Sequence, residues 1–258
     1  MEVPFHTEQA RQASVTLKTN DIKQMNKLIE FFRDKTVKTI LNVGTGTGNF
    51  LDILKKIAPT ANITGVDPNS DSLEEAEKLY PDISFQKMVS EKLEFANDTF
   101  DVASISMALH HLPDVQKGLQ EIKRVVKPDG WIIVNELYSD NLNSAQEVHK
   151  LYHHFRSSID RILGVHHNST FKKEDILNEI QQSGISVQFH MDYKKDVNLI
   201  GNSGELEMRV EKMKERLESV KAYSEYELLK PQIEKFREKA VKYGFQPATR
   251  VVVVGKKQ

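Results

Sequence analysis

Residues 40–50, ILNVGTGTGNF, decide the fold, because a run of apolar residues passes directly into three closely spaced glycines. A glycine-rich turn between a strand and a helix lets the backbone approach a ligand, and the first N–H groups of the helix are free to bind it. The glycines are Gly44, Gly46 and Gly48, spaced G-x-G-x-G. A dinucleotide-binding loop requires G-x-G-x-x-G and a Walker loop requires Gly-Lys-Ser/Thr, so both phosphate-binding classes are disfavoured.

Strand and helix patterns alternate on both sides of this loop. Short apolar runs predict strands at residues 37–43, 62–66, 82–88, 100–107 and 131–137. Apolar residues at helical spacing predict helices at 21–33, 51–57, 71–79 and 114–126. This alternation is typical of a parallel sheet covered by helices on both faces.

The pattern changes after residue 137. It predicts helices at 142–163 and 171–183, a strand at 185–193, charged helices over 205–243 with breaks near 222–224 and Pro231, and a last strand at 248–257. We therefore expect an α/β fold with a doubly wound, Rossmann-like, mostly parallel seven-stranded sheet and a helical insertion, residues 196–246, before the last strand. The charged helices could form a coiled coil, but solvated helices that cap the domain are the more common case.

Three regions follow from these patterns. Residues 1–36 would form an N-terminal lid and a helix, with Phe5 and His6 in the lid itself, residues 1–20. Residues 37–137 would form a cofactor-binding core. Residues 138–258 would supply substrate-pocket helices, the last two strands and the insertion.

The composition excludes several functions. The 36 basic and 37 acidic residues give a net charge of −1, which disfavours nucleic acid as a partner. There is no cysteine, so disulfides, thiolate metal sites and a cysteine nucleophile are ruled out. The start of the chain has no apolar signal segment, and no run approaches the roughly 18 apolar residues of a membrane span. We expect a cytoplasmic protein without a membrane partner, as a monomer or homodimer.

A carboxylate follows the second predicted strand. Asp67, in the segment GVDPNS, lies 23 residues after Gly44. A carboxylate at this place can accept hydrogen bonds from both hydroxyls of a ribose. The loop and this acid together indicate a nucleoside ligand, which need not carry a phosphate.

Four ordered segments now suggest a family. ILNVGTGTGNF, GVDPNS, LEFANDTFDVASISMALHHLPD and EIKRVVKPDGWIIVNE lie within residues 37–137. In order and spacing they resemble the class I S-adenosylmethionine-dependent methyltransferases, in the small-molecule branch of the type 11/25-like enzymes. The resemblance implies S-adenosylmethionine as cofactor, S-adenosylhomocysteine as product, and methyl transfer to an oxygen, nitrogen or sulfur atom of a small-molecule acceptor.

The resemblance also implies cofactor-binding residues. These are Asn42, Gly44, Thr45, Gly46, Gly48, Asp67, Pro68, Ser90, Ser106 and Met107. The glycines would surround the methionine part, and Pro68 would pack near the adenine together with Asn69. Ser106 and Met107 would face the sulfonium.

Two positions depart from the family pattern. The family usually has an acid where this chain has Asn42, which brings no charge to the cofactor ammonium. It also often has Asp-Ala where this chain has Val89-Ser90, and Val89 cannot accept a bond from the adenine amino group. The backbone or Glu91 would have to replace that acceptor.

Two histidines follow the fourth predicted strand, in ALHHLPD. Imidazoles titrate in the range that suits a general base. In phosphoethanolamine methyltransferases, which are similar here, a catalytic His precedes a Leu, and this maps onto His111, with His110 beside it. The segment often only shapes the pocket in this branch, so both roles remain open.

Other polar residues are candidates for substrate binding. Glu136 ends the fifth predicted strand, where it could hold an amine or a metal or remain a solvated edge residue. His149 and His153 share one helix face at i, i+4 spacing. Tyr152, Arg156 and Asp160 could bind a carboxylate or phosphate, or form a surface ion pair beside a packed ring. The predicted substrate-binding residues are Glu136, His149, Tyr152, His153 and Arg156.

The histidines also raise the question of a metal. His149, His153, His154, His166 and His167 could line one cavity with His110, His111 and Glu136. A His/carboxylate site for zinc or iron is chemically possible, but most histidine pairs bind no physiological metal, so we expect none.

Three alternatives to a small-molecule methyltransferase remain. The departures at Asn42 and Val89 leave open a non-catalytic or partner-dependent S-adenosylmethionine-binding protein. An RNA methyltransferase is disfavoured by the charge and by the absence of an Asn/Asp-Pro-Pro-aromatic signature after the fourth predicted strand. A dehydrogenase is disfavoured by the glycine spacing.

Overall fold

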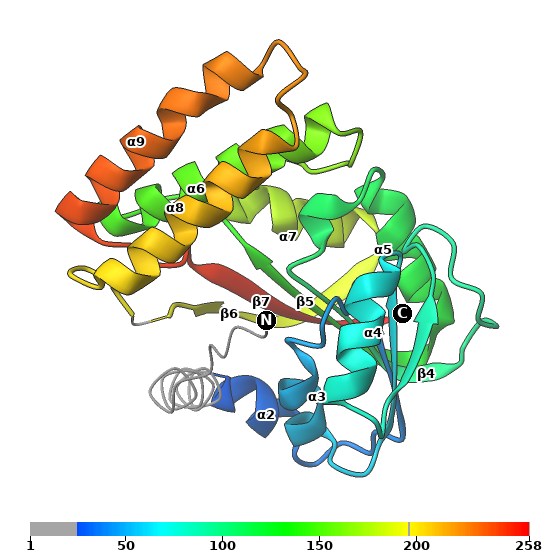
Figure 1. Cartoon of the computed structure of the whole chain (residues 1–258). Coiled ribbons are helices and arrows are strands. Elements are labelled where there is room, and N and C mark those ends of the chain that lie inside the picture. Colours follow the sequence, from blue (N-terminus) through cyan, green and yellow to red (C-terminus); the bar gives the residue numbers. More distant parts are fainter. Residues whose placement is uncertain (1–24, 196, 258) are drawn as a thin grey trace.

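The computed structural model describes residues 25–195 and 197–257. It has three layers, with a central sheet between two sets of helices (Figure 1). The predicted lid, with Phe5 and His6, lies outside the described residues. Within the described ranges, the helices are all too short or too polar to cross a membrane.

The central sheet has seven strands. They are β1 (Thr39–Val43), β2 (Asn62–Asp67), β3 (Ser84–Lys87), β4 (Phe100–Ser106), β5 (Val126–Leu137), β6 (Ile185–Tyr193) and β7 (Arg250–Lys257). Their order is β3-β2-β1-β4-β5-β7-β6, and only β7 runs antiparallel to its neighbours. This confirms the predicted mostly parallel sheet. The strand order reverses between β1 and β4, and ligands of such sheets bind there, beyond the carboxyl ends of the strands.

Helices cover both faces of the sheet. On one face, α2 (Asn26–Phe32) and α3 (Leu51–Ile57) share an apolar core with Ile40 of β1. On the other, α5 (Val115–Val125) and α7 (Lys173–Gln182) share a second core with Leu41. Successive side chains of a strand point to opposite faces, so these adjacent residues are both fully buried and the sheet is doubly wound. The remaining core helix, α4 (Ser70–Leu79), packs beside β2 and β3.

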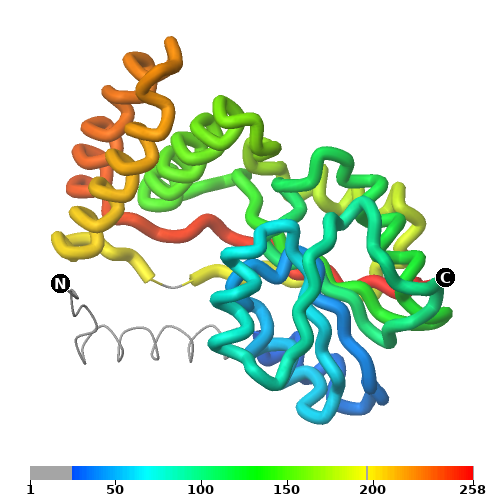
Figure 2. The backbone as a smooth tube through the Cα atoms, turned by 45° about the vertical axis from the view of Figure 1, so that its right-hand side comes forward, coloured from blue at the N-terminus to red at the C-terminus, as the bar shows by residue number. Residues whose placement is uncertain are grey.

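A third core lies in the helices outside the sheet. The helices α6 (Ser144–Ile162), α8 (Ser203–Glu218) and α9 (Tyr226–Tyr243) pack on one another through the fully buried Phe155, Val210 and Phe236. Figures 1 and 2 both show α8 and α9 as an antiparallel pair beside α6. The charged helices are therefore partly solvated caps, and they lie between β6 and β7 as predicted.

Pro231 was expected to break these helices, and that expectation was wrong. The break near 222–224 is real, because α8 ends at Glu218 and α9 begins at Tyr226, but Pro231 lies inside α9. A proline within a helix removes one backbone hydrogen bond. The buried Leu229 and Ile233 on either side pack into the third core, which offsets this loss.

One strand boundary also differs from the prediction. β5 begins at Val126, five residues before the predicted start at Trp131. Its pairing with β4 jumps from Phe100↔Val126 to Val102↔Trp131. The four residues of KPDG are accommodated in this irregularity, where Asp129 has a φ of 62°.

Candidate active site

The glycine loop after β1 is shaped by close contacts on two sides and open space on a third. Gly44, Gly46 and Gly48 have φ values of 63°, 51° and 89°, which favour glycine. A Cβ on Gly44 would lie 2.4 Å from the Cβ of Ala108, and one on Gly48 would lie 2.6 Å from the Tyr80 ring. A Cβ on Gly46 would meet nothing within 4 Å. The outer two glycines therefore allow packing, while Gly46 borders space that a ligand could fill.

Asp67 is tied to this loop. Its Oδ2 accepts a hydrogen bond from the Gly46 N–H at 2.8 Å, and its Oδ1 accepts one from the Asn69 N–H at 2.9 Å. Each carboxylate oxygen can accept a second bond, so ribose hydroxyls can still be bound. Asn69 itself caps α4 by accepting from the Ser72 N–H, and Pro68 is exposed between them.

Asn42 lies inside the sheet, almost fully buried. Its Nδ2 donates to the Ser104 Oγ at 3.4 Å, and that hydroxyl donates to the Leu41 carbonyl at 3.3 Å. A carboxylate at this position would be buried without a cationic partner from these neighbours, which is costly. The neutral amide therefore suits its surroundings.

The segment where the resemblance places the adenine contains an unsatisfied acceptor. Ser90 donates to the Oε2 of Glu91 at 2.8 Å, whereas the buried Oε1 of Glu91 has no hydrogen-bond partner among the described residues. Val89 is 48% exposed. Glu91 thus offers the acceptor that Val89 lacks, in agreement with one of the two replacements expected from the sequence.

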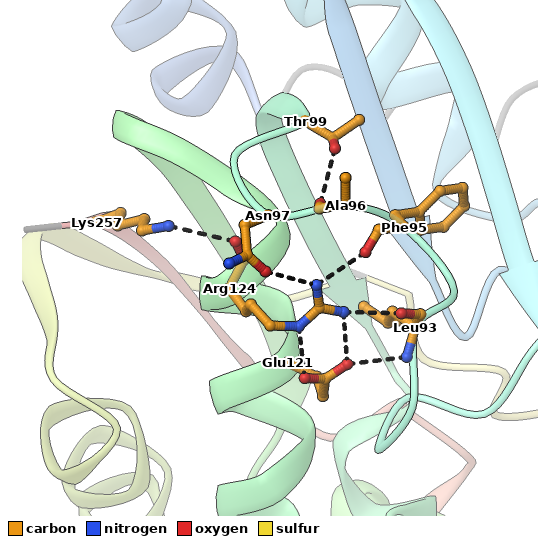
Figure 3. Close-up of polar contacts among 8 residues, drawn as sticks. All are labelled: Leu93, Phe95, Ala96, Asn97, Thr99, Glu121, Arg124 and Lys257. Carbon is orange, nitrogen blue, oxygen red and sulfur yellow. Dashed lines mark hydrogen bonds and ion pairs between the residues drawn. The ribbon is translucent and has the colours of Figure 1, made fainter.

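An arginine fastens the segment that follows. The guanidinium of Arg124 on α5 pairs with Glu121 and donates to the Leu93 and Phe95 carbonyls at 2.8 Å each, as Figure 3 shows. It also bonds to the Asn97 side chain. Residues 93–97 are thereby held against α5, directly beyond Ser90 and Glu91.

The end of β4 lies beside the glycine loop. The Ser106 Oγ accepts from the Asn135 Nδ2 at 2.9 Å, and the Met107 N–H donates to the Asn135 carbonyl at 2.8 Å. Met107 has a φ of 55°, which turns the chain into Ala108 and the 3-10 turn η1 (Leu109–His111). Because Ala108 contacts Gly44, the turn with both candidate catalytic histidines begins next to the loop.

Glu136 is completely buried and holds His110. Its Oε1 accepts from the His110 ring Nδ1 at 2.9 Å and from the Leu137 N–H at 2.8 Å, and its Oε2 accepts from the Leu109 N–H at 2.9 Å. Burial by itself raises the pKa of Glu136, but the interactions with His110 and the backbone N–H groups outweigh it and leave the pKa below its usual value. The solvated-edge interpretation of Glu136 is therefore wrong, because its carboxylate is buried and holds His110.

Four imidazoles from three segments meet at this place. The His110 ring centroid lies 4.3 Å from that of His111, 5.1 Å from that of His153 on α6 and 5.2 Å from that of His167. The His153 and His167 Nε2 atoms are 3.3 Å apart. The Nδ1 of His167 bonds to the Oδ2 of Asp160 at 2.6 Å. We name these residues, His110, His111, His153 and His167, the histidine cluster.

The surroundings keep two rings of the histidine cluster, and also the His149 ring, uncharged. Part of His111 is open to solvent, but desolvation, followed by His110 and His167, lowers its pKa to about 4. Desolvation and neighbouring histidines lower the pKa of His153 to about 2. Desolvation and nearby arginines lower that of His149 to about 3. These imidazoles are therefore neutral near pH 7.

Of the other predicted substrate residues, His149 lies beside the histidine cluster, with its ring centroid 6.4 Å from that of His153, whereas Tyr152 packs in the third core. Tyr152 is buried in the third core, with its ring 5.5 Å from that of Phe236. His149 packs on Phe245 at 5.4 Å and accepts from the Ala248 N–H. Neither Tyr152 nor the exposed Arg156, whose guanidinium lies 6.0 Å from the Tyr152 ring, contacts the histidine cluster.

Asp160 was interpreted from the sequence as part of a surface ion pair, and this was wrong. It is buried, and its cationic partner in the structure is Arg216 of α8, 56 residues away, with His167 on its other oxygen. The i, i+4 spacing to Arg156 therefore did not identify its partner. His167 appeared only among the histidines that could line a cavity, and its adjacency to His166 gave no sign of which ring turns inward.

The sequence around this site is similar to those of known proteins. Residues 41–134 match the model of a methyltransferase domain. This match and the order of the strands support a class I S-adenosylmethionine-dependent methyltransferase domain in this part of the chain.

Two relatives are similar to part of this chain. A demethylmenaquinone methyltransferase of Chlorobaculum parvum is 31% identical over 160 residues, which cover 62% of this chain and 64% of that protein. A ubiquinone/menaquinone biosynthesis C-methyltransferase of Campylobacter jejuni is 30% identical over 119 residues, 44% of this chain and 50% of that protein. The match thus spans less than two thirds of either relative.

A solved structure matches this chain over more of its length. A Bacillus halodurans protein described as a methyltransferase has a TM-score of 0.63 at 19% identity, covering 90% of this chain and 98% of that one. This similarity supports the fold over 90% of the chain. It does not define a substrate.

The site fits S-adenosylmethionine, the cofactor that the resemblance implies. Gly46 borders open space, and the buried Thr45 Oγ1 and Glu91 Oε1 lack hydrogen-bond partners among the described residues. Buried polar atoms normally have partners, so these two atoms suit a polar ligand. Asp67 retains acceptor capacity for ribose. The loop, Asp67 and Glu91 can accordingly hold S-adenosylmethionine.

Proposed function

We propose that this protein methylates a small molecule that has an acidic hydroxyl on an electron-rich ring, as in a quinol. The observation that carries this proposal is the neutral, partly accessible His111 beside the buried His110–Glu136 pair, directly after β4 and next to the glycine loop. The names of the two relatives, which concern demethylmenaquinone and a C-methyltransferase, support a quinone-type acceptor.

His111 would receive the acceptor's proton. One of its ring nitrogens bonds to the His166 carbonyl, which leaves the other as a proton acceptor. Removing the hydroxyl proton raises electron density on the oxygen and on the ring carbons beside it. When bound, S-adenosylmethionine supplies an electrophilic methyl group on sulfur. The acceptor's electron pair forms the new bond to that methyl group, the carbon–sulfur bond breaks, and S-adenosylhomocysteine is the product.

The same chemistry limits which atom of the acceptor can be methylated. A deprotonated hydroquinone can react at oxygen, which gives a methyl ether, or at an adjacent ring carbon, which then loses its own proton and regains aromaticity. The name of the Campylobacter relative, a C-methyltransferase, favours carbon. We therefore add carbon to the oxygen, nitrogen and sulfur acceptors expected from the sequence.

A labelled-methyl assay tests the proposal. Purified protein would be incubated with methyl-labelled S-adenosylmethionine and, separately, a chemically reduced demethylated naphthoquinone with a short side chain, a simple phenol, an amine and a thiol. We expect label in the quinol, with the methylated position assigned by NMR. Transfer only to the amine or thiol would contradict the proposal.

A binding measurement separates an inactive protein from a wrong substrate. Calorimetry should show S-adenosylmethionine binding to the wild type and none to Gly46→Val, whose side chain would fill the open space beside the loop. Binding without transfer to any acceptor would favour the non-catalytic alternative. No binding near millimolar concentration would argue against both.

A further inference from the structure

Three rings of the histidine cluster form a nearly equilateral triangle. The centroids of His110, His153 and His167 are 5.1, 5.2 and 4.8 Å apart. One ring nitrogen from each lies within 4.8 Å of the other two. His110 and His167 are buried, and His153 is half-buried. Three imidazole nitrogens thus converge on one point below the surface.

Buried carboxylates fix the direction of two of these rings. A carboxylate only accepts hydrogen bonds, so the Nδ1 of His110 must donate to Glu136 and the Nδ1 of His167 must donate to Asp160. In the neutral ring, Nε2 then has a free electron pair. A carboxylate behind each ring is the arrangement that orients histidines toward metals in proteins and raises their basicity.

We propose that His110, His153 and His167 bind one divalent transition-metal ion, with zinc as the best fit. Imidazole suits zinc and iron, and three imidazoles with a fourth open position are typical of reactive zinc sites. Tetrahedral zinc–nitrogen bonds of about 2.0–2.1 Å place ligand nitrogens roughly 3.3 Å apart. The His153 and His167 Nε2 atoms are already 3.3 Å apart.

The remaining nitrogens need only a small approach. Each pair of ligand nitrogens is at most 4.8 Å apart, so no pair needs to approach by more than about 1.5 Å to reach tetrahedral spacing. The buried Nδ1 of His153 has no hydrogen-bond partner among the described residues, so its ring is the least constrained of the three. Rotation of this ring can adjust its distance to the His110 nitrogen.

The ion would leave a fourth position for water or for an oxygen of a small ligand. The His111 ring lies 4.2 Å from that of His167 and 4.3 Å from that of His110, so it borders the same site. An oxygen bound there would be polarised by the ion and would lose its proton more easily. The inference goes beyond the proposed function, because metal binding requires neither cofactor nor acceptor.

Zinc titration of tag-free protein tests the site. The protein would be stripped with a chelator and titrated with zinc chloride against a chromophoric competitor, without S-adenosylmethionine. We expect one ion per chain, with affinity lowered at least 100-fold in His153→Gln and His167→Gln. Asp160→Asn, which keeps the ligands but weakens their orientation, should lower affinity about 10- to 100-fold. His190→Gln, at an exposed histidine on β6, should have no effect.

Spectroscopy and stability decide between this site and adventitious binding. X-ray absorption at the zinc edge should show nitrogen or oxygen neighbours at about 2.0–2.1 Å. Circular dichroism of each stripped variant checks that it folds. The proposal is overturned if the wild type binds no zinc, iron or cobalt below millimolar concentration, or if the folded His153 and His167 variants bind as tightly as the wild type. Neither result depends on whether methyl transfer occurs.

Discussion

At the scale of single residues, the site is defined by polar atoms with and without partners. Glu136 has three donors around a fully buried carboxylate, so it serves as a fixed support. Glu91 and Thr45 each keep one buried oxygen without a partner among the described residues, which suits a ligand. His111 is open to solvent on one side and neutral at physiological pH. Substitutions at these positions should therefore have distinct effects.

Replacing His111 tests its role as base. We expect His111→Ala to lower kcat about 100-fold or more, because a positioned base contributes about that much, while cofactor affinity changes little. Steady-state kinetics with the accepted substrate and calorimetry with S-adenosylmethionine measure the two effects. His190→Ala serves as the control. A loss smaller than about 10-fold would leave His111 with a packing role only.

Replacing Asn42 by Asp tests the effect of the acid that the family usually has at this position. In Asn42→Asp we expect a loss of about 1–3 kcal/mol in unfolding free energy without cofactor, because the new charge is buried beside neutral neighbours. Urea unfolding measures it. Adding S-adenosylmethionine should recover part of the loss if the cofactor ammonium reaches this position. An equally stable variant would show that water or a cation already solvates the site.

At the scale of elements, the segment after Glu91 depends on α5. Arg124 supplies hydrogen bonds to two backbone carbonyls of this segment and pairs with Glu121, which also accepts from the Leu93 N–H. Lys257 of β7 bonds to the Asp98 carboxylate and to the Arg124 and Val126 carbonyls, near the same corner. The segment expected to border the adenine is thus fixed from outside the glycine loop.

Removing Arg124 should loosen that segment. In Arg124→Ala we expect faster amide hydrogen exchange over residues 89–99 and a stability loss of about 1–3 kcal/mol, since charge-assisted hydrogen bonds to the backbone are lost. Arg124→Lys should recover little, because an ammonium cannot replace the planar fork. Arg237→Ala, which removes the ion pair between Arg237 on α9 and Glu207 on α8, is the control and should leave this segment unchanged. Unchanged exchange in Arg124→Ala would contradict the anchoring role.

At the scale of the whole molecule, the titration of the histidines should control stability in mild acid. The pKa values of His111, His149 and His153 are lowered to about 4, 3 and 2, below the value of about 6.5 in an unfolded chain. The unfolded chain therefore binds more protons below about pH 6.5. The stabilisation is fully present above pH 6.5 and is lost as the pH falls toward these values.

Thermal unfolding from pH 7.5 to 4 checks this. We expect Tm to fall steadily below about pH 6.5, before the carboxylates titrate. For the largely buried His149, the unfolding free energy should fall by up to about 1.4 kcal/mol per pH unit. His149→Gln should remove that part of the pH dependence. A flat profile down to pH 4.5 would mean that these rings are better solvated than their packing indicates.

The sequence predicted the parts of the molecule that depend on local spacing. The glycine loop, Asp67 and the alternating strands and helices follow from short-range rules, and they lie where expected. The histidine cluster depends instead on how α6 packs against the end of β4. The contact between Asp160 and Arg216 joins two helices, and no spacing rule identifies it. The position of His167 beside His153 required the same packing information.

The helix α6 contributes both to the histidine cluster and to the third core, and this affects how the protein unfolds locally. One face of the helix presents His153 and Asp160 to the histidine cluster, while Phe155 and Ile159 are buried in the core shared with α8 and α9. The helix cannot leave one without disturbing the other. We expect the backbone amides of such a helix to exchange with solvent as one cooperative unit. The inserted helices α8 and α9 would then hold α6, and with it the histidine cluster, in place. A protease cut between α8 and α9 would therefore inactivate the site without touching it.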